Sequence, residues 1–455
     1  MKLNKNGQLI TIALGAILNP LNSAMISIAL PYIQKDFQLP YTTATWLISS
    51  YYLSSAIAQP VMGKISDQIG PRRLFLAGLI LVAISALAAP WSTTFFALLL
   101  FRLFQSVGSS TLYPSGVSII HRHAQGNQAY AMAFIATCTT TSAALGPTVG
   151  GFLVAWGGWP AIFTVNFPVL ALSFLLGWFF LPPDPKPSKR SLDDTLRKVD
   201  FPGIVLFALA IAFFLWFLLS FESRPHPISG LVGLVFGIAF VLRELKVDHP
   251  FIDFHFFIKH PGLATVYMQF IVINIFYYSL FFGLPTYFQT TLHFDARYSG
   301  MLMLFISGWS ALVSPSTGRW ADRAGFCRPL LAGASCMTVG AILLTLFFTD
   351  ASLTAIGITL SITGISFGIM NVALQAAVLK LSPSSMIGVS SGLFQTSRYF
   401  GSILSSVVLG LVFGNDISSG SLHQLGYVLI GLSIIVSLIS FMLWTKEWKR
   451  KESNP

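Results

Sequence analysis

Two arginines lie inside long apolar stretches of the sequence, where a charged side chain is unusual. Arg102 stands in LFRLFQSVGSS and Arg398 in SGLFQTSRYF. A buried arginine costs at least about 2.5 kcal/mol unless it meets carbonyl groups, water or an anion. Gln105 and Tyr113 follow Arg102 at helical spacing, which predicts a polar helix face that lines a cavity. A permanent bond to backbone carbonyls is the alternative for both arginines.

No carboxylate accompanies these arginines. All 16 Asp and Glu, and all eight His, fall in predicted loops, tails or the ends of apolar stretches. Proton transfer through a buried acid is therefore disfavoured, as is capture of a cationic ligand by one. GVSSG at 388–392 fits a serine-nucleophile pattern, but that pattern needs a strand before it, and here it opens an apolar stretch. We expect no enzyme, no metal and no cofactor.

The composition assigns the chain to a membrane. Of its 455 residues, 54% are hydrophobic and only 9% are charged, whereas soluble globular proteins carry roughly 25% charged residues. Its apolar stretches match the length of spanning helices, about 20 residues, and leave no room for a soluble catalytic domain. The net charge of +11 is scattered among short loops, so it predicts no nucleic-acid partner.

The positive charges predict the orientation. With the N-terminus inside, 22 of the 27 Lys and Arg fall on the cytoplasmic side and three on the outer side, which predicts that both termini are cytoplasmic. We expect an all-α polytopic membrane protein with fourteen transmembrane helices. Its predicted parts are an N-terminal six-helix half (1–181), a cytoplasmic linker with two extra transmembrane helices (182–261) and a C-terminal six-helix half (262–455).

A repeat relates the two halves. Residues 63–73 read GKISDQIGPRR, and residues 318–328 read GRWADRAGFCR. Five positions match at identical spacing, with Lys in one copy and Arg in the other at the second position. Both copies lie between two apolar stretches. This recurrence predicts two homologous halves related by an axis along the membrane normal.

The repeated pattern resembles the loop signature of the major facilitator superfamily of secondary transporters. The segment around Arg102 is similar to that family's fourth-helix motif, and AALGPTVGG (143–151) to its fifth-helix antiporter motif. GGWPAIFTVNFP (157–168) resembles a segment of the fourteen-span drug:proton antiporter branch. The resemblance covers nearly the whole chain and implies the major facilitator fold, with an extra helical hairpin between its halves.

The resemblance implies a conformational gate at the repeat. The carboxylate of Asp67 would face the N-terminal dipole of a helix from the other half, a contact worth roughly 0.3–2 kcal/mol. Arg72 and Arg73 would hold the carboxylate and the loop. A solvated loop that only sets the topology is the alternative. The residues assigned to the gate are Gly63, Asp67, Gly70, Arg72, Arg73, Gly318, Asp322 and Arg328.

The antiporter motif consists of Gly146, Pro147, Gly150 and Gly151. Small residues at this spacing allow helix backbones to approach closely, and the proline allows a bend. In the family this packing distinguishes antiporters from symporters, so the motif favours export. Generic helix packing with no bearing on the transport direction is the alternative.

Further polar residues fall on helices that are expected to line a wet, mostly uncharged cavity. Each by itself is better explained by a hydrogen bond between helices. This chain has Asn22 where the antiporter branch typically has an acidic residue, which again disfavours a buried acid. The predicted substrate pathway consists of Asn19, Asn22, Arg102, Gln105, Tyr113, Gln269, Asn274, Tyr277, Asn371, Gln375 and Arg398.

Three functions stay open from the sequence. The first is a secondary-active exporter of small lipophilic compounds, either with or without coupling to protons. The second is a carrier for a specific neutral or anionic metabolite, and the third is a membrane enzyme or a sensor that transports nothing. For either transporter, the expected partners are a small-molecule substrate and the lipid bilayer. Protons join them if transport is coupled to a proton gradient. Short loops favour a monomer in a bacterial inner membrane.

Overall fold

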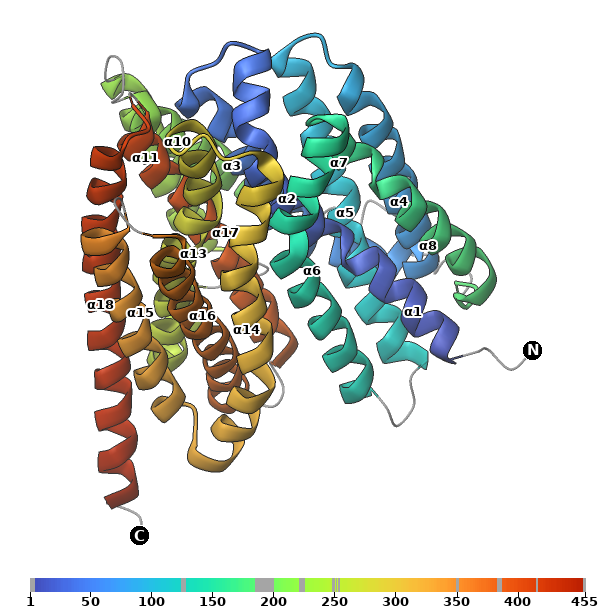
Figure 1. Ribbon diagram of the computed structural model, residues 1–455. Coiled ribbons are helices and arrows are strands. Elements are labelled where there is room, and N and C mark those ends of the chain that lie inside the picture. Colours follow the sequence, from blue (N-terminus) through green and yellow to red (C-terminus); the bar gives the residue numbers. More distant parts are fainter. Residues whose placement is uncertain are drawn as a thin grey trace. The chain divides into compact units, whose positions relative to one another are not determined.

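The computed structural model describes residues 5–123, 128–184, 200–220, 226–247, 250, 252, 254–348, 352–382, 387–414 and 416–452. All regular secondary structure in these ranges is helical (Figure 1). The elements up to the middle of the chain are α1 (Lys5–Ala16), α2 (Leu18–Asp36), α3 (Tyr41–Ile69), α4 (Pro71–Ala88), a 3-10 turn (Ala89–Trp91), α5 (Phe95–His123), α6 (Gln128–Gly157), α7 (Ala161–Thr164) and α8 (Asn166–Phe180). They are followed by α10 (Phe201–Leu219), α11 (Pro227–Glu244), α12 (Phe254–Lys259), α13 (Pro261–Thr290), α14 (Ala296–Ala324), α15 (Cys327–Phe347), α16 (Leu353–Leu381), α17 (Ile387–Phe413) and α18 (Ser419–Glu452).

The prediction of fourteen transmembrane helices is wrong. Among the described residues, ten helices are long and apolar enough to cross a membrane, and α1 and α2 together form one of them. Three long helices, α3, α6 and α14, are not among the ten. They carry many Ser, Thr and Gly residues, and α3 and α14 end in charged ones, which dilutes their apolar content. In α10 the described apolar stretch is short, Phe201–Phe214.

The chain folds as two compact units. The first consists of residues 1–39, 43–146 and 153–254, and the second of residues 40–42, 147–152 and 255–455. In the first unit, α4 packs along α5 and α8, α1 packs along α8, and α10 pairs with α11. In the second, α16 packs against α14 and α15, α13 against α17, and α15 against α18 (Figure 1). The division at residues 181 and 261 stays a prediction.

Small residues allow these helices to approach closely. A Cβ at Gly78 of α4 would collide with Thr111 of α5. In the second unit, a Cβ at Gly364 of α16 would collide with the backbone of Ile306 on α14, and one at Gly368 would meet the carbonyl oxygen of Ser310 at 2.6 Å. Lipid tails are as apolar as leucine, so close backbone packing of this kind is a main source of helix association in membranes.

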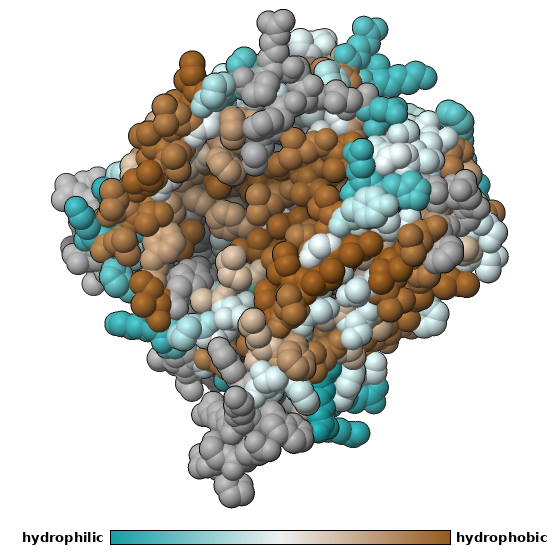
Figure 2. All heavy atoms as spheres, turned by 90° about the vertical axis from the view of Figure 1, so that its left-hand side faces the viewer, coloured by the Kyte–Doolittle hydropathy of each residue, from teal (hydrophilic) through white to brown (hydrophobic). Residues whose placement is uncertain are grey.

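The outer faces of the helices suit a lipid surrounding. Figure 2 shows apolar side chains over most of one face, with hydrophilic residues mainly toward its edges. Many hydroxyl groups bond within their own helix, as when Ser85 donates to the carbonyl of Leu81 at 2.7 Å and Thr286 to that of Phe282 at 3.0 Å. Such bonds satisfy a polar group where no water is available.

Candidate functional site

Arg102 lies inside the first unit, on α5, and its side chain is almost completely buried, at 1% exposure. The guanidinium donates to Gln105 Oε1 at 2.8 Å and to the backbone carbonyl of Asn22 at 3.4 Å. Its Cζ lies 4.2 Å from the ring centroid of Tyr51 and 5.8 Å from that of Phe163. The ion pairs seen among the described residues do not include Arg102. Dipoles and aromatic faces therefore stabilise its charge.

Polar side chains from α2, α3 and α5 form a hydrogen-bonded network beside this arginine. Asn19 donates through Nδ2 to Ser109 Oγ at 3.0 Å and to Ser55 Oγ at 3.4 Å. The Tyr51 hydroxyl lies 3.1 Å from Ser109 Oγ, and Ser55 Oγ lies 2.8 Å from Ser106 Oγ. All five side chains are buried. The network joins three helices through polar groups in an apolar surrounding, where such bonds are strong.

Three buried donors here have no acceptor among the described residues. They are Nε of Arg102, Nε2 of Gln105 and Nδ2 of Asn22. A buried donor without an acceptor costs about 1–3 kcal/mol, so the site favours water or a ligand that brings acceptor atoms. We call the set of Asn19, Asn22, Tyr51, Ser55, Arg102, Gln105, Ser106 and Ser109 the Arg102 cluster.

Asn22 is held in place by a residue from the segment that resembles the antiporter branch. Its Oδ1 accepts a hydrogen bond from Asn166 Nδ2 at 2.8 Å. The same amide group of Asn166 also donates to the carbonyl of Phe163 at 2.9 Å. The short helix α7, which carries Phe163, and the first turn of α8 therefore fix the side chain that stands where the antiporter branch has an acidic residue.

In the second unit, the predicted pathway residues mainly join helices. Gln269 donates to a serine hydroxyl of α18 at 2.7 Å, and Tyr277 donates to a serine hydroxyl of α16 at 2.6 Å. Asn274 donates to a carbonyl of its own helix, α13, at 2.7 Å. All three residues are buried. These bonds match the interhelical alternative that the sequence left open for single polar residues.

The remaining pathway residues are less enclosed. Arg398 is half-buried, with its Cζ 5.9 Å from the ring centroid of Phe270. Asn371 is half-buried and Gln375 is exposed. Tyr113, in the first unit, packs against the apolar core beneath α1 and α4. Of the eleven predicted pathway residues, Asn19, Asn22, Arg102 and Gln105 come together in the Arg102 cluster.

The turn between α3 and α4 carries the predicted gate residues of the first unit. Gly70 has φ of 107°, a conformation that favours glycine. Asp184, beyond α8, accepts hydrogen bonds from the backbone N–H groups of Arg72 and Arg73, both at 2.9 Å. The Arg72 guanidinium donates to the carbonyl of Trp178 at 2.6 Å. An aspartate at this position satisfies free N–H groups and meets the positive end of the α4 dipole, so Asp184 fixes the turn.

We expect Asp184→Ala to destabilise the protein by about 1 kcal/mol, the usual cost of losing an N-terminal helix cap. Amide hydrogen exchange should accelerate at Arg72 and Arg73. Asp295→Ala is the matched control, because Asp295 caps α14 by accepting from the N–H of Tyr298 at 2.7 Å. That variant should leave exchange at Arg72 and Arg73 unchanged. Unchanged exchange in Asp184→Ala would show that the carboxylate does not hold this turn.

The second copy of the repeat has the same local form. Gly325, which matches Gly70, has φ of 80° and separates α14 from α15. Asp322 and Arg328 are exposed, and Gly318 is half-buried. In the first copy Gly63 packs against Pro114. The side chain of Asp67 lies outside the described residues, so its role as the gate carboxylate stays a prediction.

The antiporter motif lies in α6, and its residues Gly146, Pro147, Gly150 and Gly151 are buried. A Cβ at Gly146 would collide with the side chain of Ala24 on α2. Close packing of these two helices therefore depends on glycine at this position.

Three important residues were missed from the sequence. Tyr51 and Ser55 stand four positions apart in ISSYYLSS, and this helical spacing could have placed them on one polar face. Asp184 had no comparable signal, because its partners lie more than 100 positions earlier in the chain.

Comparison with known proteins decides the family. The model of the Major Facilitator Superfamily matches residues 12–406, most of the chain. The chain belongs to this superfamily. It is a multi-pass membrane protein and a transporter rather than an enzyme, and transporters of this superfamily bind small-molecule substrates. The family predicted from the repeat is thereby confirmed.

Several relatives match 90% or more of this chain. The chain is 53% identical to the uncharacterized MFS-type transporter YwoD of Bacillus subtilis, over 94% of this chain and 96% of YwoD. It is 25% identical to the riboflavin transporter RibZ of Clostridioides difficile, over 90% of this chain and 88% of RibZ. It is also 25% identical to the tetracenomycin C resistance and export protein of Streptomyces glaucescens, over 90% of this chain and 76% of that protein.

The fold likewise matches solved transporters. The structure of a bacterial homologue of the human drug peptide transporters PepT1 and PepT2 aligns over 98% of this chain and 99% of its own, with a TM-score of 0.71 and 13% sequence identity. At this identity the match supports the fold alone.

Proposed function

We propose that this transporter exports small lipophilic compounds that are neutral or anionic, by alternating access, and that it belongs to the drug antiporter branch of the superfamily. The observation that carries the proposal is the buried Arg102 with unpartnered donors around it. A site with excess donors and a cation suits a ligand with carbonyl, phenolate or carboxylate oxygens. It disfavours a cation, since two buried like charges repel.

The export direction is supported by relatives and by the motif on α6. One relative is named as a resistance and export protein. Gly146 allows the close packing of α6 and α2 that the antiporter motif requires. In this proposal the Arg102 cluster and Arg398 belong to the substrate pathway, and the two repeat copies form the gate. Both termini lie in the cytoplasm of a bacterial cell, and the protein works as a monomer in the inner membrane.

A carrier for one specific metabolite is the second candidate. It is favoured by the relative named as a riboflavin transporter, which covers most of this chain. The Arg102 cluster would suit such a ligand equally well, because it offers several fixed donors rather than an apolar surface. A broad range of accepted compounds would favour the exporter, and a single accepted compound would favour the carrier.

The test is transport by the purified protein in proteoliposomes. Matched fluorescent compounds that are anionic, neutral, monocationic and dicationic are compared, with riboflavin in a parallel assay, each with and without a pH gradient. We expect efflux of the neutral and anionic compounds and little transport of the dication. Efficient efflux of the dication would refute the proposed substrate class. Dependence on the pH gradient would show proton coupling.

We expect Asn22→Asp to shift the preference toward lipophilic cations. The new carboxylate would belong to the residue whose backbone carbonyl accepts from the Arg102 guanidinium at 3.4 Å. An opposite charge on this neighbouring side chain should offset the charge of the arginine, so anionic compounds should lose several-fold in transport rate while monocations gain. The ratio of the two rates is the measurement. A ratio equal to that of the unmodified protein would mean that Asn22 does not border the substrate.

A further inference from the structure

A groove runs along the outer side of the α10–α11 hairpin and shares no residue with the Arg102 cluster. Its volume is about 460 Å³, and its walls are almost entirely apolar. On α11 it is lined by Leu234, Ile238 and Leu242, each more than half exposed, and on α10 by Ala210 and Phe214. Among the ten described apolar spans, α11 has the smallest share of buried residues, 22%. The groove therefore opens toward the surroundings of the hairpin rather than toward the interior of the unit.

Two glycines of α11 decide where the helices of the hairpin touch and where they separate. A Cβ at Gly233 would lie 2.9 Å from the backbone nitrogen of Phe214, so the two helices are in close contact there. One turn later, a Cβ at Gly237 would have no atom within 4 Å. Beyond it, the buried rings of Phe207 and Phe240 pack with their centroids 5.4 Å apart. The missing side chain at Gly237 therefore leaves the groove open between two points of contact.

The length and the chemistry of the groove suit a hydrocarbon chain. Its lining on α11 extends from Gly233 to Leu242, a rise of about 14 Å along the helix. This is roughly half of the ~30 Å hydrocarbon core, the depth of one leaflet. Apolar cavities stay dry, and an empty groove would forfeit the dispersion contacts of its walls. In a bilayer, a lipid acyl chain is the ligand that meets both conditions.

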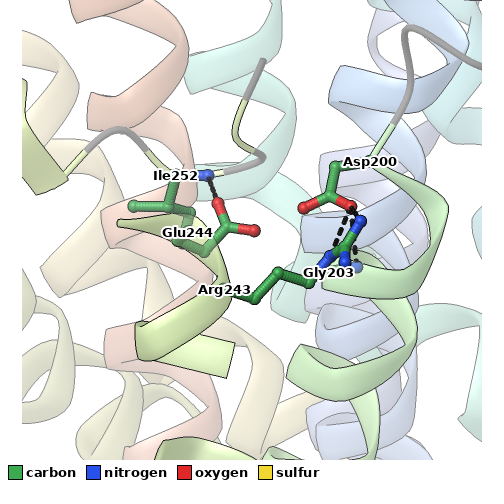
Figure 3. Close-up of polar contacts among 5 residues, drawn as sticks. All are labelled: Asp200, Gly203, Arg243, Glu244 and Ile252. Atoms are coloured by element: carbon green, nitrogen blue, oxygen red, sulfur yellow. Dashed lines mark hydrogen bonds and ion pairs between the residues drawn. The ribbon is translucent and has the colours of Figure 1, made fainter. Parts of the chain in front are cut away.

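The end of the groove at the C-terminus of α11 carries exposed cations. Figure 3 shows the Arg243 side chain extending from α11 to Asp200, where Nε donates to Oδ1 at 2.8 Å, yet 36% of this side chain is exposed. Lys246 is also exposed. It stands four positions after Leu242, which places it on the groove side of the turn. The carboxyl groups of Asp200 and Glu244 are buried, so the exposed charge described at the hairpin base is positive.

We propose that the groove binds one acyl chain of an anionic phospholipid, whose phosphate meets Lys246 and the exposed part of Arg243. The chain fills the space over Gly237, and the lipid belongs to the leaflet at the C-terminal end of α11. An anionic headgroup gains binding energy from each Lys or Arg near the membrane surface, so the two cations favour it over a zwitterionic one. This inference does not rest on the proposed function, because the groove and the Arg102 cluster have no residue in common.

Photo-crosslinking of the purified full chain in lipid nanodiscs tests the site. The probes are phosphatidylglycerol and phosphatidylcholine with the same acyl chains, each carrying a diazirine in the middle of one chain. We expect cross-links on α10 and α11, about fivefold more from phosphatidylglycerol, which is the effect of one cation on an anionic headgroup. Gly237→Leu should remove most of them by filling the groove. Gly431→Leu on α18 is the matched control, because a Cβ there also has no atom within 4 Å, and it should keep them.

The headgroup contact is tested with the same two probes. Lys246→Gln should reduce the advantage of phosphatidylglycerol on α10 and α11, whereas Lys35→Gln, at an exposed lysine in the last turn of α2, should leave it unchanged. The proposal is overturned if the two probes label the hairpin of the unmodified protein equally, or if neither labels it, and these results require no variant to fold. It is also overturned if Gly237→Leu is labelled as strongly as the unmodified protein.

Native mass spectrometry of the same protein tests the other occupant that an apolar groove could take, a second copy of the chain. We expect a monomer that retains phosphatidylglycerol, and weaker retention in Gly237→Leu than in Gly431→Leu. A lipid-free dimer that Gly237→Leu dissociates would assign the groove to the second copy and overturn the proposal.

Discussion

Arg102→Met is expected to lower the transport of anionic compounds at least tenfold while the protein still folds. A hydrogen bond to a charged group contributes about 1.5–3 kcal/mol, and each 1.4 kcal/mol corresponds to about a factor of ten. Burying a charge costs several kcal/mol of desolvation, and an apolar side chain of similar length removes that cost while it fills much of the same space. Arg102 is fully buried and has no carboxylate partner among the described ion pairs, so folding should tolerate the change.

The measurement is the initial rate of uptake or efflux for matched anionic and neutral compounds. Arg323→Met serves as the control, because Arg323 is exposed in the last turn of α14 and should leave both rates unchanged. Arg102→Lys should recover part of the anionic rate, since lysine keeps the charge but loses the planar donors that reach Gln105 and Asn22. Equal losses for anionic and neutral compounds would mean that Arg102 supports the helices rather than the ligand.

Gly70→Ala is expected to destabilise the protein by about 2 kcal/mol or more and to abolish transport. At φ of 107° any other residue is strained, at a cost of about 1–3 kcal/mol. A Cβ at this position would also collide with the carboxyl group of Asp184. The substitution would therefore disrupt the bonds from Asp184 to the start of α4 as well as the turn itself.

Two control variants, compared by thermal unfolding, separate the effect of backbone strain from that of the collision with Asp184. Gly158→Ala introduces strain without a collision, because φ is 68° and the nearest atom, on Pro160, is 3.5 Å from the added Cβ. Gly237→Ala introduces neither, since nothing lies within 4 Å. Stability should fall most for Gly70→Ala, less for Gly158→Ala and little for Gly237→Ala. A Gly70→Ala variant as stable as Gly237→Ala would contradict the role of Asp184 and of the turn.

Local patterns in the sequence predicted local structure well. Arg102 and Gln105, three residues apart on one helix, do contact one another. The repeated motif does mark a glycine turn between two helices in each copy, at Gly70 and Gly325. Both inferences depend on spacing within one or two turns of helix, which the sequence displays directly.

Two kinds of property were harder to predict: contacts with residues far away in the sequence, and the apolar content averaged over a whole helix. The number of spans was wrong because helices such as α3 and α14 are long but carry many polar residues. Gln269 and Tyr277 were assigned to the substrate pathway, yet they bond to serines of other helices. A polar residue in an apolar stretch needs some partner, but the sequence does not say which helix supplies it.

The contact between Asp184 and the start of α4 also determines when the turn after α3 can be completed during folding. The two sides of this contact are 112 residues apart, and α8 lies immediately before Asp184 in the chain. Chains generally fold from the N-terminus during synthesis. The turn after α3 therefore leaves the ribosome long before the residue that caps it. Until α8 has been inserted into the membrane, the first two N–H groups after Pro71 must rely on water or lipid headgroups, and a nascent chain truncated before residue 184 would keep this turn open.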